Sequence, residues 1–267
     1  MIAQLSLSEW LCLLVAAAGI GVSKSGFSGV SMLHVVLFAW VFGAKLSTGV
    51  LLPMLVIGDL MAIRFFGKQV QWRHVLRLLP PTAIGVVIGT LLMGRLDEQT
   101  FRPTIGWIIF SLTCLQAVRI WRPHLLHNVP HQVWFAWTLG MLAGITTMMA
   151  NAAGPVVALY LLAVSLPKLE LVGTSAWFFL VINVFKLPFS YHLGFISIHS
   201  LLIDLLCSPA ILGGMLVGRW MVHHIPQKAF DTLLLAFTAL ASLQLVGIVR
   251  LPSSQAAGEP TSVESHP

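Results

Sequence analysis

The stretch Gly19-Ile-Gly-Val-Ser-Lys-Ser-Gly-Phe-Ser-Gly29 separates two apolar segments with small residues and one lysine. Backbone that is not helical survives at membrane depth only where protein buries it or where it lines a wet cavity, because lipid offers no hydrogen bonds. A second break, Ala150-Asn-Ala-Ala-Gly-Pro155, follows about 125 residues later. We predict that the two breaks face each other inside a membrane.

The composition supports a membrane location. Hydrophobic residues make up 57% of the 267 residues, charged residues only 9%, and the mean hydropathy is +0.90. This leaves too little polar surface for a water-soluble domain and indicates an all-α integral membrane protein, with the lipid bilayer as a partner. The net charge of +6 comes from Lys and Arg in short loops, as topology signals do, so nucleic acid is not an expected partner.

Apolar runs divide the chain into about ten segments, which predicts eight to ten membrane helices, some of them short or re-entrant. The expected segments are 5–22, 29–43, 47–63, 75–94, 101–118, 132–148, 154–166, 172–187, 198–218 and 229–249. We expect a first membrane repeat at 1–122, a cytoplasmic connecting loop at 123–131, a second repeat at 132–250, and a disordered polar tail at 251–267.

The two halves of the chain repeat each other. The run Pro80-Pro-Thr-Ala-Ile-Gly-Val-Val-Ile-Gly89 matches Pro209-Ala-Ile-Leu-Gly-Gly-Met-Leu-Val-Gly218, and Asp59 falls near Asn183 after a similar interval. Each repeat holds five segments, and an odd number inverts the second copy. Inverted repeats with broken segments are typical of secondary transporters whose site lies at the repeat interface.

The distribution of positive charge gives an orientation. The loop after the third segment carries Arg64, Lys68, Arg73 and Arg77, whereas the region after the eighth has only Lys186 as Lys or Arg. The positive-inside rule places the first of these loops in the cytoplasm and the second outside. Both chain termini are then predicted to be non-cytoplasmic.

The order of these motifs resembles the sulfite exporter TauE/SafE family of membrane permeases. The residues that carry the resemblance are the first break, Lys45, Ser47-Thr48-Gly49, Gly58-Asp59-Leu60, the second break, and Val172-Gly-Thr-Ser-Ala-Trp-Phe-Phe179. The resemblance covers nearly the whole chain except the tail. It implies passage of sulfite, sulfonates or related organosulfur anions across a bacterial inner membrane. The chain departs from many members by having polar residues among the glycines of its first break.

At the first break, Lys24 would attract an anion. Ser25, Gly26 and Ser28, with the free N–H groups that open the next helix, would bind its oxygen atoms. A lysine at mid-bilayer costs at least about 2.5 kcal/mol without water or a partner. The alternative is that the turn reaches the surface and Lys24 is an ordinary topology signal.

At the second break, Asn151 is the expected counterpart of Lys24, with Thr147 beside it. Thr48, Thr174 and Ser175 are expected to start long helices next to the breaks and to offer hydroxyl and N–H groups to the substrate. Helix capping is the alternative role for Asn151 and for these hydroxyls. A threonine inside a membrane helix also commonly bonds to its own backbone.

Three further polar residues are candidates for coupling or gating: Asp59, Asn183 and Lys186. A carboxylate inside a membrane segment is a functional candidate by default, and Lys45 or Arg64 are the expected ion-pair partners of Asp59. The alternative places Asp59 at a helix end beside Arg64. Lys186 has its own alternative, in which it extends along its stem to the membrane surface.

These patterns favour a secondary transporter of small anions that works by alternating access. A non-transporting accessory or assembly subunit and an intramembrane enzyme are the alternatives. The sequence contains no P-loop and no HExxH or GxSxG motif, so neither an enzyme nor ATP use is expected. No cofactor and no metal site are expected, since Cys and His lack ligand spacing. The glycine pairs at 85/89 and 214/218 permit close helix packing, either within the bundle or in a homo-oligomer.

Overall fold

The computed structural model describes residues 5–27, 30–122, 133–164 and 166–224, together with scattered residues between 232 and 248. This part of the chain is all-α and contains no strand. Its helices are α1 (Leu7–Lys24), α2 (Ser31–Phe42), α3 (Ala44–Phe66), a short 3-10 helix η3 (Gly67–Gln69), α4 (Trp72–Arg95), α5 (Glu98–Trp121), α6 (Val133–Ala150), α7 (Gly154–Ala163), α8 (Lys168–His192) and α9 (Ile198–His224).

Seven of these helices are long and apolar enough to cross a membrane: α1, α3, α4, α5, α6, α8 and α9. The short helices α2 and α7 have 12 and 10 residues, so they span only about 18 and 15 Å of a hydrocarbon core about 30 Å thick. Large apolar side chains face outward, among them Leu205 and Leu216 of α9. This outer surface suits contact with lipid.

Nine of the ten expected segments correspond to these helices. About half of the tenth, 229–249, lies outside the described residues, as do the whole connecting loop at 123–131 and the tail at 251–267. Four long helices, α3, α4, α5 and α8, extend further than expected at both ends: α3 begins at Ala44 rather than at 47, and α8 begins at Lys168 rather than at 172. Apolar content alone misses these polar end turns.

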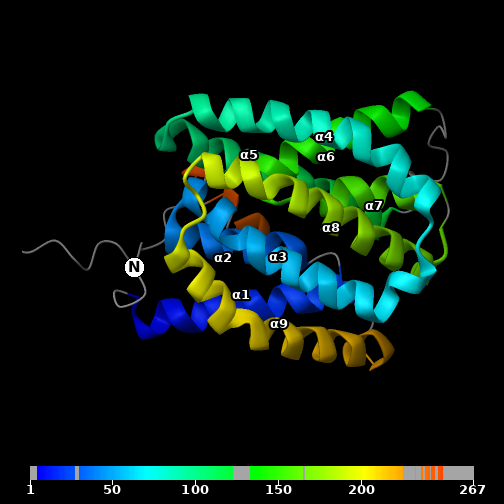
Figure 1. Ribbon diagram of the computed structural model, residues 1–267, viewed down its shortest axis with the longest axis horizontal. Helices are drawn as coiled ribbons and strands as arrows, with labels where there is room; N and C mark the ends of the chain where they lie inside the picture. Colours follow the sequence, from blue (N-terminus) through cyan, green and yellow to red (C-terminus); the bar gives the residue numbers. More distant parts are fainter. Residues whose placement is uncertain are drawn as a thin grey trace, which may run out of the picture.

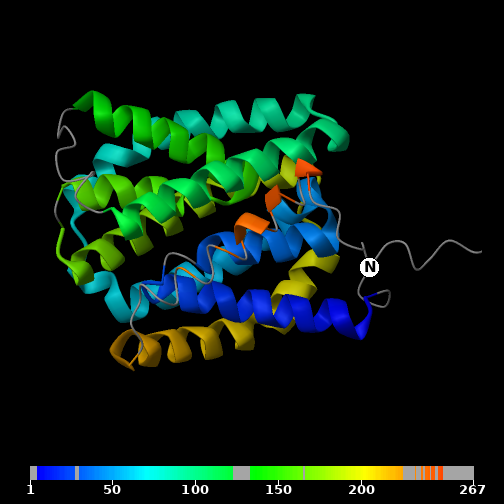
Figure 2. The same ribbon diagram turned by 180° about the vertical axis from the view of Figure 1, so that it is seen from behind.

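The helices form a bundle with two matching edges. α1 and α9 lie side by side along one edge, and α4 and α6 lie along the opposite edge (Figure 1). α3 and α8 pack against each other between these edges, an arrangement that the reverse view repeats (Figure 2). If the two halves are repeats as predicted, α1 and α9 correspond to α6 and α4, and α3 corresponds to α8. The inverted relation between the halves stays a prediction.

Local sequence explains where the helices near the breaks begin and end. α1 starts with a capping box, in which Ser6 Oγ accepts from the Glu9 amide and the Glu9 carboxylate accepts from the Ser6 amide at 2.8 Å. After α1, Gly26 takes a φ of +117°, a conformation that L side chains rarely adopt. Pro155 stands in the first turn of α7, where its missing N–H leaves no helix bond unmade.

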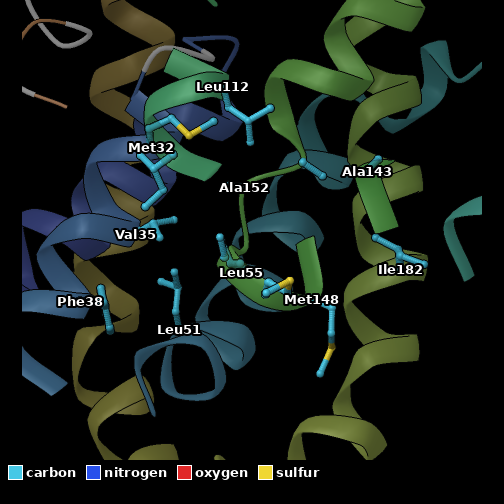
Figure 3. Packing of buried hydrophobic residues seen from close by; sticks show 14 of the residues in the cluster. Met32, Val35, Phe38, Leu51, Leu55, Leu112, Ala143, Met148, Ala152 and Ile182 are labelled. Carbon is cyan, nitrogen blue, oxygen red and sulfur yellow. The ribbon is translucent and has the colours of Figure 1, made fainter. Parts of the chain in front are cut away.

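A single large apolar cluster joins the short helices to the rest of the bundle. Figure 3 shows Met32, Val35 and Phe38 of α2 beside Leu51 and Leu55 of α3, with Met148 and Ala152 approaching from α6 and the second break. Ala152 is 1% exposed, so the second break lies inside the protein. The non-helical backbone there is shielded from lipid, as the sequence led us to expect.

Glycines allow the two edges of the bundle to pack closely. A Cβ on Gly214 of α9 would overlap the backbone of Ala18 on α1, and one on Gly85 of α4 would overlap the backbone of α6 near Gly144. Membrane helices use small residues in this way because close backbone approach improves their packing. These glycines therefore allow close packing of helices within one chain. They give no support to the predicted homo-oligomer.

Two neighbouring glycines give a matched test of this packing. Gly214→Ala is expected to lower the unfolding free energy by about 1–3 kcal/mol, because the new methyl group must push α1 away from α9. Gly213→Ala is expected to be neutral or stabilising by up to about 1 kcal/mol, because nothing lies within 4 Å of its Cβ position. Thermal unfolding in detergent, followed by tryptophan fluorescence, measures both. Equal midpoints for the two variants would contradict the packing described.

Candidate functional site

A cavity of about 560 Å³ lies between the two breaks. Lys24 and Gly26 line it from the first break, and Asn151 and Gly154 line it from the second. The two breaks are therefore close together in space, although more than a hundred residues separate them in the chain. Further polar lining comes from Ser23, Ser31, His34, Thr147, Ser175 and Asn183.

An ion pair joins the first break to the centre of the bundle. Lys24 Nζ lies 2.5 Å from Asp59 Oδ1 of α3, and Asp59 is fully buried. Asn183 of α8 donates to the other carboxylate oxygen at 2.7 Å. The Lys24 side chain, 13% exposed, also lies over the ring of Phe179 at 4.6 Å from its centroid. The arrangement connects α1, α3 and α8 at one wall of the cavity.

The ion-pair partner of Asp59 differs from the sequence expectation. Lys45 instead donates to the carbonyl oxygen of Leu96 at 2.7 Å, and Arg64 lies exposed on the surface. Asp59 faces the interior of the bundle rather than a helix end, so its partner comes from another helix. Spacing along one helix cannot identify such a partner.

A second polar network ties α8 to the second break. Lys186 Nζ lies 2.5 Å from Asn151 Oδ1, 2.7 Å from the Thr147 carbonyl oxygen and 3.2 Å from Thr147 Oγ1. The residue is 1% exposed, so the alternative in which Lys186 extends to the surface is wrong. The reason is that α8 continues past Lys186 to His192, which places this lysine inside the bundle.

Asn151 holds the second break in place. Its backbone has a φ of +50°, and its Nδ2 donates to the Thr48 carbonyl oxygen of α3 at 2.7 Å. The alternative that Asn151 caps α7 is wrong, because the cap residue is Ala153 and no side chain caps this helix. The side-chain amide instead bridges α3 and Lys186, so both its nitrogen and its oxygen have hydrogen-bond partners.

The N-termini of both short helices face the cavity. Ser31, the first residue of α2, and Gly154, the first of α7, line it. A Cβ on Gly154 would lie only 3.2 Å from Ser31 Oγ, so the two helix starts are adjacent. Neither helix has a side-chain cap at this end. Helix N-termini carry partial positive charge and favour anions.

The remaining sequence candidates divide into two groups. Thr147 and Ser175 line the cavity, whereas Ser25, Thr48 and Thr174 do not, and Ser28 lies outside the described residues. The hydroxyls of Ser25 and Thr48 donate to their own helices, and Thr174 Oγ1 accepts from the Gln71 amide. Thr48, Thr174 and Ser175 do not start long helices as expected, since α3 and α8 begin at least one turn earlier.

Sequence reasoning missed several residues of the cavity wall, among them His34 and Phe179. His34 lies one turn into α2 among apolar residues and is 2% exposed. An imidazole in the middle of such a short apolar segment is a usable signal, because burial of a polar group is costly unless it has a purpose. Phe179 carried no such signal, since aromatic residues are common throughout this chain.

The two lysines near the cavity differ in their partners. Lys24 is paired with Asp59, but no carboxylate of the described chain lies within 4.0 Å of the Lys186 nitrogen. Lys186 bonds only to neutral oxygens. Lys24 and two helix N-termini therefore lie on the cavity wall, and Lys186 has no counter-charge beside it in the described chain. Such a site favours a negatively charged ligand.

The profile of the family described as "Sulfite exporter TauE/SafE" matches residues 11–245. The chain is also similar to a protein of Comamonas testosteroni named "Probable inner membrane transporter protein TsaS". The two are 25% identical over 182 residues, which cover 67% of this chain and 73% of that protein. No solved structure matches the chain.

Proposed function

Because the chain belongs to the sulfite exporter TauE/SafE family, we propose that it is a secondary permease for small organosulfur anions in a bacterial inner membrane. The anion enters the cavity between the two breaks and is held near Lys24, Asn151 and the N-termini of α2 and α7. The protein then changes which side of the membrane the cavity opens to.

One observation carries this proposal: both breaks line the same cavity, with Lys24 and the first residues of α2 and α7 on its wall. A charged side chain such as Lys24 inside a membrane protein is costly unless a partner, a ligand or water receives it. The network residues Asp59, Asn183 and Lys186 lie on α3 and α8, the two helices between the matching edges. If these contacts rearrange when the anion binds, binding is coupled to movement of the α1/α9 edge relative to the α4/α6 edge.

The size and lining of the cavity favour a sulfonate with an organic body over bare sulfite. About 560 Å³ falls in the size range of sites for organic ligands. Apolar side chains form much of the cavity wall: Leu55, Ala158, Leu162, Leu171, Val172 and Phe179. A sulfonate head near Lys24 with carbon atoms against this wall would satisfy both parts of the cavity.

Flux measurements with purified protein in liposomes test the proposal. We expect uptake of a radiolabelled alkanesulfonate above that of protein-free liposomes, with saturation as the concentration rises. A Lys68→Ala variant is a suitable control, because Lys68 is exposed and far along the chain from both breaks. Folded protein that moves no anion would favour an accessory role instead. Chemical conversion of the sulfonate would favour an enzyme.

A further inference from the structure

The cavity reaches one end of the bundle and stops in the middle. Along α7 its lining runs from Gly154 to Leu162, nearly the full length of the helix. Along α8 it runs from Leu171 to Asn183 and stops there, although the helix continues to His192. Leu162 is 42% exposed, whereas Asn183 is 2% exposed. The cavity therefore opens toward the end of the bundle where α8 begins, and it is closed toward the end where α8 finishes.

The contacts of two glycines relate α3 to α8. A Cβ on Gly173, near the start of α8, would overlap the carbonyl oxygen of Phe66 at the end of α3. A Cβ on Gly49, near the start of α3, would overlap the backbone of Phe195, just after the end of α8. The two helices are therefore antiparallel and make matching contacts at opposite ends of the bundle. These contacts support the predicted correspondence of α3 with α8, and with it that of α2 with α7, which precede them in the chain.

The correspondence predicts a second path along α2. The counterpart of the lined path along α7 and the first half of α8 follows α2 and the first half of α3, toward the closed end. Four apolar side chains, here called the apolar layer, fill this second path and are each 5% exposed or less: Val35, Phe38, Ala39 and Leu51 (Figure 3). The cavity lining on α2 ends at His34, before this layer. The apolar layer therefore separates the cavity from the closed end.

Lys186 lies on the closed side of the cavity. It is one turn beyond Asn183 on α8, and it is 1% exposed. Its nitrogen contacts the neutral oxygens of Thr147 and Asn151. A charge inside a membrane protein is costly unless water, a counter-charge or a ligand reaches it. An anion on the second path would pass close to this lysine, so its charge favours anion movement on the closed side as well.

We propose that this structure is the permease open to one side of the membrane, and that the anion reaches the other side along α2 and α3 when the apolar layer separates. The inference rests on the proposed permease function and identifies the gate that it needs. Arg64, Lys68 and Arg73 lie between the last turn of α3 and the first turn of α4, at the open end. The positive-inside rule makes that end cytoplasmic.

A matched pair of alanines tests the second path. Ala158 of α7 and Ala39 of α2 are 6% and 5% exposed, and of the two Ala158 alone lines the cavity. Each is replaced by cysteine, and oriented membrane vesicles are treated from one side with a cationic methanethiosulfonate that does not cross the bilayer. An anionic reagent could itself be transported. We expect the Ala158→Cys thiol to react at least about tenfold faster from the open end, since a minor state is populated at roughly 10% or less.

The Ala39→Cys thiol is expected to react from the opposite end alone. Its reaction should become at least about twofold faster when ethanesulfonate is supplied for transport, because transport populates the state in which the layer is open. The native cysteines give a background that is subtracted with wild-type vesicles treated in parallel. Lys68→Cys and His199→Cys, exposed at the open and the closed end, report which side the reagent has reached.

A loosened apolar layer should open the second path. Leu51→Ala in the Ala158→Cys protein is expected to raise the reaction rate from the closed end about tenfold or more, because the closed state loses apolar contacts that the open state lacks. Leu78→Ala is the control, since Leu78 is equally buried but lies on α4 beside α6. It should leave the ratio of the rates from the two sides unchanged. A ratio measured within one inserted protein does not respond to a general loss of stability.

The possible outcomes separate the gate from the permease function. An Ala39→Cys thiol that reacts from neither side, in protein that carries out anion flux, would overturn the second path and leave the permease function standing. If Ala39→Cys does not fold, Leu51→Cys places a thiol in the same layer and is judged in the same way. Faster reaction of Ala158→Cys from the closed end would overturn the assignment of the open side. Absence of flux for every sulfonate tested with wild-type protein would overturn the permease function itself, and the inference would fall with it.

Discussion

Asp59→Leu is expected to lower the unfolding free energy by about 3–5 kcal/mol, because it leaves the Lys24 ammonium without its counter-charge inside the bundle. The lower end of this range is expected, since the Lys24 side chain is 13% exposed and lines a cavity. The substitution also removes the acceptor of the Asn183 amide. Chemical denaturation in mixed micelles measures the loss.

The double variant Lys24→Met with Asp59→Leu separates stability from function. Replacing both members of a buried ion pair by apolar residues is often neutral or stabilising, so most of the lost stability should return. Anion transport should not return, because the double variant lacks the lysine beside the cavity. A double variant that transports as well as wild type would contradict the role given to Lys24. A single variant as stable as wild type would contradict the importance of the ion pair.

Lys186→Gln is expected to weaken anion binding about 30-fold while the protein stays folded. Glutamine can still donate to Asn151 Oδ1 or to the Thr147 carbonyl oxygen, but it carries no charge. For an anion about 8 Å from the lysine nitrogen, the lost attraction is about 2 kcal/mol at an effective dielectric constant of about 20. That energy corresponds to roughly a 30-fold change in the dissociation constant.

The matched control for this variant is Lys68→Gln, which removes the same charge from an exposed position. It should bind the anion as wild type does, since solvent and salt screen surface charges. Both proteins can be compared by titration with 2-hydroxyethanesulfonate. Unchanged affinity in Lys186→Gln would show that the Lys186 charge does not serve the cavity.

The sequence predicts most of the helices and the position of the breaks, because both depend on local features. Apolar runs define the helices, and small residues with Pro155 or Gly26 define where the chain leaves them. The partners inside the bundle could not be predicted in this way. Asp59 has charged neighbours within its own helix, yet its partner is Lys24, which only the packing of α1 against α3 brings near.

The partners of Lys186 could not be predicted from the sequence either. Its position near Pro188 is typical of a residue at a helix end, but α8 continues through this proline to His192. Whether the side chain turns inward depends on a hydrogen-bonding site built by another helix, here Thr147 and Asn151. His34 was missed for a related reason, since its role depends on a cavity that no single segment contains.

We propose that the anion binds between the two breaks. A crystal structure with 4-bromobenzenesulfonate tests this placement, because anomalous scattering locates the bromine without reference to the protein. We predict one bromine peak inside the cavity, with the sulfonate head near Lys24, Ser31 and Gly154 and the ring toward Phe179. A bound anion found only on the outer surface of the bundle, with the cavity empty at saturating concentration, would contradict this account.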